Sequence, residues 1–165
     1  MDVTCAVPQA EWVDVATALA PSLLRLAVML TGSRHDAEDL LQGTFVRAQR
    51  HGQRIAAMTA PGAYLRTIML REFASERRRP RLRTVSMAEA PVQPSEPDMT
   101  TGEDLWPLLA TLPKQQRAVL VLRYYEDLPD GEIAVLVGCS RATVRSHASR
   151  GVAALRTILE AQEAR

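Results

Sequence analysis

The fold of this chain follows from one stretch, Pro129-Asp-Gly-Glu-Ile-Ala-Val-Leu-Val-Gly-Cys-Ser-Arg-Ala-Thr-Val-Arg-Ser-His-Ala-Ser-Arg-Gly-Val-Ala-Ala-Leu155. Apolar residues at helical spacing predict two helices within it. Gly138 lies where the first helix should end, because glycine tolerates the left-handed backbone of a helix terminus. Ser140 follows at a position suited to capping the second helix near Thr143. The stretch therefore predicts a helix-turn-helix.

The second of these helices has two contrasting faces. Four apolar residues on one side should pack inward, namely Val144, Ala148, Val152 and Leu155. The opposite side is cationic and rich in hydroxyl groups, and no carboxylate occurs between Ser140 and Glu160. Such a face favours insertion into the major groove of DNA. The residues expected to contact DNA are Arg141, Thr143, Arg145, Ser146, Ser149 and Arg150.

A simpler interpretation fits the same stretch. Pairs of helices around a glycine turn are common in bundles, and a basic outer face is often only solvated. The remainder of the chain has to decide between DNA binding and this structural explanation.

Composition limits the fold class. Of the 165 residues 47% are hydrophobic but only 4% are aromatic, so the core must consist mainly of aliphatic side chains. Long stretches of helical periodicity and few β-branched runs predict an all-α protein. We expect two small helical domains joined by a flexible linker, with the helix-turn-helix in the C-terminal domain.

Charge is segregated along the chain, although the formal net charge is only +1. Seven arginines and two glutamates lie in residues 66–83, whereas residues 84–104 hold five acids and no base. Nineteen of the 20 basic residues are arginine, which suits bidentate contacts to phosphates and bases. A GC-rich genome would give the same bias without selection for such contacts. Local patches, rather than net charge, should attract the partners.

Other kinds of site have little support in the sequence. Cys5 and Cys139 are too few for a disulfide framework, and neither has metal-ligand spacing. We expect no metal, no cofactor and no catalytic residue. The beginning of the chain lacks the basic segment of a signal peptide, and the apolar run 19–30 is too short and interrupted to span a bilayer. These features predict a cytoplasmic protein without membrane insertion.

The N-terminal part should begin with two helices. Residues 9–31 predict a helix that bends or breaks at Pro21, which cannot donate a backbone hydrogen bond. Ser33 should cap the next helix, with Asp36 as the return partner of a capping box. The buried face of that second helix is expected to comprise Ala37, Leu41, Phe45 and Ala48.

The opposite face of the second helix carries Asp39 and Gln42 beside Val46. Acids near the start of a helix are explained by the helix dipole, which accounts for Asp36 and Glu38. It does not account for a polar pair next to an exposed apolar residue. An interaction surface and an ordinary solvated face therefore both remain open from the pattern alone.

An arginine-rich helix should follow a loop at residues 50–58. Pro61 suits a first turn, and the helix is expected from Gly62 to about Arg79. Its apolar side should be Leu65, Ile68, Met69 and Phe73, and its outer side carries Thr67, Arg71, Ser75 and Arg78. Cations favour a helix C-terminus, but the number of arginines here exceeds what capping needs, so a polyanion is the expected partner.

The predicted linker is rich in proline and acidic residues. It contains Pro91, Pro94 and Pro97 and shows no apolar period, so it should be flexible and non-helical. The predicted domains are residues 9–80 and 102–161, with residues 81–101 between them. The second domain should contain helices at 104–112 and from Pro113 to about 127, ahead of the helix-turn-helix.

Three motifs, in a fixed order and with the polar linker before the last, resemble a known family. They are Asp36-Ala-Glu-Asp-Leu-Leu-Gln-Gly-Thr-Phe45, Ala63-Tyr-Leu-Arg-Thr-Ile-Met-Leu-Arg-Glu-Phe-Ala-Ser-Glu-Arg-Arg-Arg79 and Leu112-Pro-Lys-Gln-Gln-Arg-Ala-Val-Leu-Val-Leu-Arg-Tyr-Tyr-Glu-Asp-Leu128, followed by the helix-turn-helix. The chain looks like a bacterial sigma factor of the extracytoplasmic-function (ECF) group, within the sigma-70 family. The resemblance covers about residues 10–80 and 102–160.

The resemblance implies promoter recognition and start-site melting, with catalysis left to RNA polymerase. Core polymerase, through the clamp coiled coil of its large subunit, and promoter DNA are the implied partners, and an anti-sigma protein is a further candidate. The first motif would bind polymerase through Asp39, Leu40 and Gln42. The −10 surface would comprise Thr67, Arg71, Ser75, Arg77 and Arg78, and the helix-turn-helix residues given above would contact the −35 element. The loop 49–58 matches the segment that receives a flipped −10 base.

The chain departs from the family pattern at two positions of the −10 helix and in the loop. Members commonly carry Trp where Tyr64 stands and Asn where Arg71 stands, and the loop from Arg50 lacks a Trp often found there. These departures concern the details of −10 reading and leave the overall role unchanged.

Two other functions fit parts of the sequence. A stand-alone helix-turn-helix regulator would explain residues 129–155 but neither the arginine helix nor the Asp39 and Gln42 patch. An enzyme is disfavoured because Asp36, Glu38 and Asp39 splay around a helix, the three histidines are isolated, and no phosphate-binding glycine loop occurs.

Overall fold

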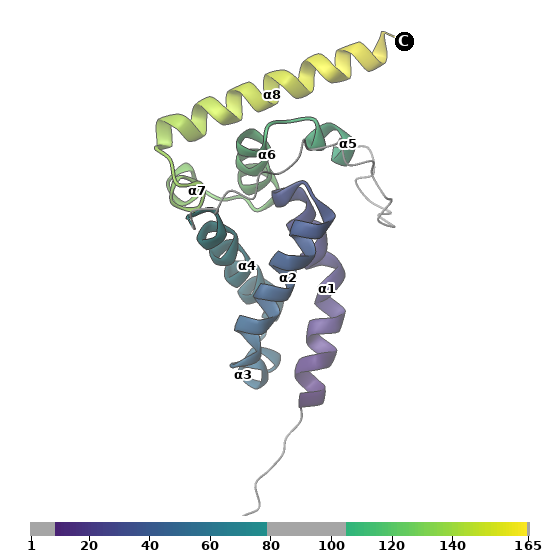
Figure 1. The fold of residues 1–165 in the computed structure, drawn as a ribbon, viewed down its shortest axis with the longest axis vertical. Coiled ribbons are helices and arrows are strands. Elements are labelled where there is room, and N and C mark those ends of the chain that lie inside the picture. The colour runs from purple at the N-terminus through teal and green to yellow at the C-terminus, as the bar shows by residue number, and fades with distance from the viewer. Residues whose placement is uncertain (1–8, 79–104, 165) are drawn as a thin grey trace, which may run out of the picture.

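The first half of the protein is a helical domain built around a long first helix. The computed structural model describes residues 9–78 and 105–164 (Figure 1). Its helices in the first range are α1 (Gln9–Thr31), α2 (Arg34–Gln49), α3 (Gly52–Ala56) and α4 (Pro61–Arg78). Helix α1 packs against α2, α3 and α4, and their facing apolar side chains form the core of this domain.

The second half is a group of shorter helices closed by one long helix. In order they are α5 (Leu105–Ala110), α6 (Lys114–Leu120), the π-helical turn η1 (Val121–Tyr125), α7 (Asp130–Val137) and α8 (Arg141–Glu163). Helix α8 runs across the end of the molecule formed by α5, α6 and α7 (Figure 1). The described residues contain no strand, and the prediction of an all-α protein with two small helical domains is confirmed. The predicted linker, residues 81–101, lies outside the described residues, and the domain boundaries stay predictions.

Helix α1 is continuous through Pro21, so of the expected bend or break the break does not occur. A proline inside a helix costs about 3 kcal/mol. Burial of Leu23, Leu26 and Leu30 outweighs that cost, since each buried leucine contributes about 1.5–3 kcal/mol. By length and composition the segment Glu11–Thr31 could also cross a membrane, which the shorter run 19–30 did not suggest. In this structure Leu23, Leu26 and Leu30 of the helix pack in the core.

Helix α2 begins as expected, and Ala37 and Ala48 of its predicted inner face are fully buried. Ser33 accepts a hydrogen bond from the Asp36 backbone N–H at 3.4 Å, which confirms the predicted cap. Leu40 and Thr44 are fully buried where Leu41 and Phe45 were expected to be. Thr44 tolerates this position because its hydroxyl donates to the Leu40 carbonyl at 2.7 Å, so the buried hydroxyl is hydrogen-bonded.

The segment expected to be a loop contains the short helix α3. Its Ile55 is fully buried, and Gly52 lies against the indole of Trp12, where a Cβ atom would come within 2.7 Å of the ring. Trp12 also packs edge-to-face on Phe45, with ring centroids 6.2 Å apart. The burial of Ile55 and the close approach of Gly52 to Trp12 order this turn. Neither feature gives a helical period in so short a segment, so the sequence pattern did not indicate the helix.

The two halves touch through a buried arginine. Arg117, in the middle of α6, is only 4% exposed, and its Nη2 donates to the Thr31 carbonyl at the end of α1 over 2.9 Å. The next residue, Gly32, has φ +76°, and the guanidinium fills the space that a Cβ atom would need. Helix α4 also packs against α7. The arginine therefore satisfies a carbonyl that the end of α1 would otherwise leave without a partner.

Candidate nucleic-acid interfaces

The helix-turn-helix forms as the sequence predicts. Gly138 ends α7 in the left-handed conformation, with φ 73°, and its N–H donates to the Ala134 carbonyl at 2.9 Å. Ser140 caps α8 by accepting from the Thr143 N–H at 3.1 Å. These two local interactions fix where α7 ends and α8 begins, and hence the direction of the second helix.

The inner side of α8 is held by small residues as well as by the expected apolar ones. Val144 and Ala148 are buried as predicted, whereas Val152 is exposed. Gly151 takes the inward place, because its backbone lies so close to Leu120 that a Cβ atom would come within 2.8 Å of that side chain. The expectation for Val152 was wrong because a glycine carries no hydrophobic signal in the sequence.

The outer side of α8 is open to solvent. The side chains of Arg141, Arg145, Ser149 and Arg150 are exposed, while those of Thr143 and Ser146 are half-buried. The Thr143 hydroxyl shares a hydrogen bond with the Ser140 hydroxyl at 2.9 Å, so its first role is in the cap. The four exposed residues therefore form the part of the predicted set that is free to reach DNA.

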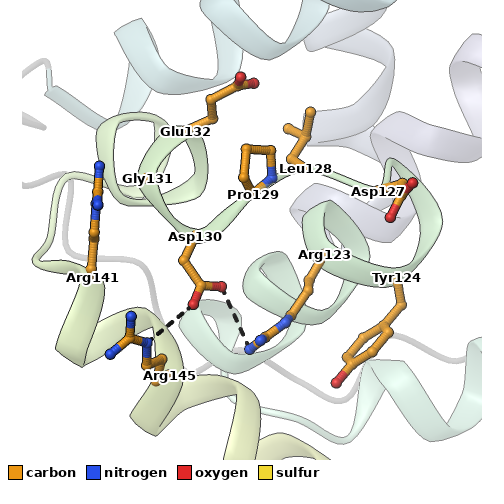
Figure 2. Close-up of a pocket in the computed structure, with 10 residues that line it drawn as sticks. All are labelled: Arg123, Tyr124, Asp127, Leu128, Pro129, Asp130, Gly131, Glu132, Arg141 and Arg145. Atoms are coloured by element: carbon orange, nitrogen blue, oxygen red, sulfur yellow. Dashed lines mark hydrogen bonds and ion pairs between the residues drawn. The ribbon is translucent and has the colours of Figure 1, made fainter.

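A cleft of about 660 Å³ lies where η1, the start of α7 and the start of α8 meet (Figure 2). Three arginines and three acids line it; they are Arg123, Arg141, Arg145, Asp127, Asp130 and Glu132. Arg145 and Arg123 both contact Asp130, at 3.3 Å and 3.6 Å. Sequence analysis missed Arg123 and Asp130, because neither belongs to the helix that carries the cationic face.

The arginine helix α4 has a more mixed environment. Thr67 and Arg71 are exposed, Ser75 is half-buried, and the Arg78 side chain is outside the described part of the chain. Arg77 is half-buried and lies over the Phe73 ring, 5.3 Å from its centroid. Burial lowers the pKa of the Arg77 guanidinium from its usual value, against the opposing influence of the nearby Cys139 thiol.

The patch on α2 consists of fewer residues than predicted. Asp39 and Gln42 are exposed, and Val46 beside them is 66% exposed. Leu40 is fully buried in the core, so the prediction that it belongs to a binding surface is wrong. It sits one residue from Asp39 on a helix, and this step of about 100° turns its side chain inward.

A second hollow lies on the same domain, between α1, α2 and the segment around α3. Its volume is about 770 Å³, and its lining includes Trp12, Phe45 and residues 49–54. It therefore overlaps the segment 49–58 that was expected to be a loop. Elsewhere, the described residues contain no cluster of three or more His, Cys, Asp or Glu side chains that could hold a metal ion.

Both halves match described families. Residues 15–83 match Sigma-70 region 2, and residues 103–155 match Sigma-70, region 4. The order of the two matches follows the order of the interfaces described above.

Relatives are similar to this chain in sequence over most of its length. The ECF RNA polymerase sigma factor SigE of Mycolicibacterium smegmatis is 36% identical over 159 residues, which cover 90% of this chain and 62% of that protein. The RNA polymerase sigma-E factor of Streptomyces avermitilis is 34% identical over 145 residues, which cover 86% of this chain and 81% of that protein.

A solved structure also matches. It is the sigma factor RpoE in complex with the anti-sigma factor NepR from Bartonella quintana, with a TM-score of 0.55 and 27% identity over 89% of this chain and 95% of that one. Fold, order of motifs and sequence identity thus agree, and the chain belongs to the ECF RNA polymerase sigma factors of the sigma-70 family.

Proposed function

We propose that this protein is an alternative sigma factor that binds core RNA polymerase, recognises −35 and −10 promoter elements and helps to melt the start site. The observation that carries this proposal is a capped helix-turn-helix with an open cationic face, joined in one chain to a domain with a second arginine helix. A stand-alone helix-turn-helix regulator would need the helix-turn-helix but not the second arginine helix. Catalysis belongs to the polymerase, and the protein acts in the cytoplasm.

The −35 element is assigned to the outer face of α8. Arg141, Arg145 and Arg150 are exposed along this helix, and arginine can donate two parallel hydrogen bonds to a guanine or a phosphate. Thr143, Ser146 and Ser149 supply hydroxyl groups for shorter contacts to the backbone. Phosphate contacts set the register of the helix, and base contacts supply the sequence preference.

The −10 element is assigned to α4 and to the hollow beside α3. Thr67 and Arg71 are exposed on α4, and Arg77 and Arg78 follow in its last turn. The hollow next to Trp12 has room for an unstacked base, whose extraction costs a few kcal/mol and must be compensated by contacts in a pocket. Trp12 also lines this hollow, although Gly52 and Phe45 cover most of its indole.

Core polymerase is assigned to the α2 patch. Asp39 and Gln42 are exposed on one side of α2, with Val46 as an apolar neighbour. The double substitution of Asp39 and Gln42 to Ala should weaken binding to core polymerase while helical content stays unchanged. Substitution of Arg34, which is exposed on the same helix and pairs with Glu38 at 2.9 Å, is the matched control. Unaltered polymerase affinity of the double variant would contradict this assignment.

Runoff transcription tests the whole function. The purified chain, core polymerase and genomic fragments should give discrete transcripts that core polymerase alone does not give. A stand-alone regulator would instead bind duplex promoter DNA without polymerase and give no initiation. An anti-sigma protein is a further candidate partner, since the similar RpoE was solved in complex with one.

A further inference from the structure

Three acids line the cleft of the helix-turn-helix beside its three arginines, and one of them, Asp130, pairs with two of these arginines. Asp130 is the first residue of α7, and its side chain is only 19% exposed. Its Oδ2 accepts a hydrogen bond from Arg145 Nε at 3.3 Å, and its Oδ1 lies 3.6 Å from Arg123 Nη1 (Figure 2). The carboxylate thus joins α8 to η1, two elements that are separated in sequence by α7.

Stability is a weak explanation for this arrangement. The Arg145 side chain is 69% exposed, and ion pairs at such positions contribute about 0–1 kcal/mol. An acid in the first turn of a helix gains a similar amount from the helix dipole. Next to DNA, however, the same negative charge repels phosphates and reduces affinity for every sequence alike. A carboxylate here weakens general DNA binding without a large gain in folding energy.

The atoms that make the contact indicate a different benefit. Arg145 uses Nε, the nitrogen nearest its stem, and so keeps both Nη groups available at the open end of the guanidinium. A guanidinium reads guanine by donating to O6 and N7, which takes two N–H groups in one plane. Fixing Nε sets that plane before DNA arrives and reduces the side-chain entropy lost on binding.

The positions of Arg123 and Arg141 agree with the fixing of Arg145 by Asp130. Arg123 holds the second oxygen of Asp130, so the carboxylate is fixed from both sides. The Arg141 guanidinium lies instead along the α7 backbone, where a Cβ atom on Gly131 would come within 2.9 Å of its Nη2. Figure 2 shows Arg141 directed away from Asp130, while Arg145 and Arg123 converge on it.

We propose that Asp130 is a positioning residue for upstream promoter recognition, which orients Arg145 through Nε so that its free end reads a guanine. Arg123 completes the arrangement by orienting Asp130. This inference rests on the proposed −35 role of α8 and adds the base class that Arg145 selects. It predicts that Asp130 lowers affinity for DNA in general while it raises preference for one sequence.

The test uses the full chain bound to core polymerase and a promoter fragment obtained by runoff transcription with the wild type. Matched fragments replace each G·C pair of the upstream element with A·T, one at a time. Equilibrium binding gives the ratio of affinities for the original and each replaced fragment. The variants are Asp130→Ala, Arg145→Ala, the two together, and Glu132→Ala as the control. Glu132 is an exposed acid in the same first turn, with no ion pair to another described residue.

The expected result is a loss of preference without a loss of general affinity. Asp130→Ala should reduce discrimination at one G·C pair roughly five- to fifty-fold, as expected for a bidentate base contact that is no longer pre-oriented. Its binding to the replaced fragment should be unchanged or tighter, because a negative charge has been removed. Glu132→Ala should leave the ratio unchanged. In the Arg145→Ala background, Asp130→Ala should have no further effect on that ratio.

The possible outcomes separate this inference from the function on which it rests. If Asp130→Ala and Glu132→Ala raise affinity for all fragments equally, Asp130 acts only as a repulsive charge and the inference is overturned. If Arg145→Ala loses discrimination but Asp130→Ala does not, the −35 role stands and the positioning role fails. If the wild type shows no preference among the fragments, the −35 role itself fails. Unchanged thermal unfolding of Asp130→Ala confirms that the comparison is made on folded protein.

Discussion

The two helices assigned to DNA, α4 and α8, differ in how much of their positive charge is available. On α8 the arginines at 141, 145 and 150 are all exposed. On α4 the last described turns pack against α7, and Arg77 is half-buried over the Phe73 ring. Both helices carry arginine at helical spacing, so local sequence does not distinguish them. Contact between the two halves of the protein creates the difference.

This difference has a physical consequence for binding. A cation that is half-buried has lost part of its hydration, and its attraction for a phosphate must replace a contact that already exists. A cation on an open helix face keeps its hydration and attracts DNA through the local potential. In the free protein, α8 should therefore be the first of the two helices to engage DNA.

The largest expected effect concerns the contact that holds the halves together. Arg117→Ala should lower the free energy of unfolding by about 2–4 kcal/mol, because it removes a buried charged hydrogen-bond donor and strands the Thr31 carbonyl. Urea unfolding followed by circular dichroism measures this change. Arg156→Ala, on the exposed side of α8, is the matched control and should cost less than about 0.5 kcal/mol. A similar small effect at Arg117 would mean that α1 and α6 are not joined in solution.

The next effect distinguishes recognition from stability on the open helix. Arg145→Ala should weaken binding of the polymerase complex to its upstream element by about 1–3 kcal/mol, the value for one bidentate base contact. Its thermal unfolding should stay close to that of the wild type, because the side chain is 69% exposed. Competition binding with intact and scrambled upstream elements measures the first quantity. Retention of the full promoter preference would assign base reading to a neighbouring side chain.

A smaller effect compares the two helices directly in the free protein. Arg150→Ala should weaken binding to non-specific duplex DNA and lower the slope of log affinity against log salt by about 1, as for one lost phosphate contact. Arg77→Ala should leave that slope unchanged, because its guanidinium already lies against Phe73 at the α4–α7 contact. Fluorescence anisotropy at several salt concentrations measures both. Equal slopes for the two variants would remove the distinction between the helices.

Local chemistry explains why the helix-turn-helix could be predicted so closely. The left-handed backbone of Gly138 and the cap at Ser140 depend on residues within a few positions of each other. The turn and the cap can therefore be recognised from the local sequence. The same holds for the Ser33 cap of α2 and for the exposure of Asp39 and Gln42.

The features that were missed depend on residues distant in sequence. Gly52 orders α3 because Trp12 lies beside it, and Arg117 is buried because the end of α1 offers a carbonyl. In the sequence, Asp130 looks like an ordinary acid in the first turn of a helix. Its pairs with Arg123 of η1 and Arg145 of α8 form only in the folded protein. Leu40 was assigned to polymerase binding from the family motif, whereas the fold buries its side chain in the core. Periodicity does not encode such pairings, so they emerge only from the fold.

The smallest expected effect tests by pH whether α4 and the C-terminal domain pack together. Burial raises the pKa of the Glu126 carboxyl, which follows η1, while Arg66 on α4 acts in the opposite direction. A raised folded-state pKa means that the folded protein binds this proton more tightly, so stability falls as the pH rises through it. Glu126→Gln should therefore raise stability above that pKa, by less than about 1 kcal/mol because the carboxyl is partly solvated. Thermal unfolding from acidic to neutral pH measures this, with Glu160→Gln on exposed α8 as the control. Parallel pH profiles for wild type and Glu126→Gln would show that the carboxyl is solvated and that the contact with α4 is open.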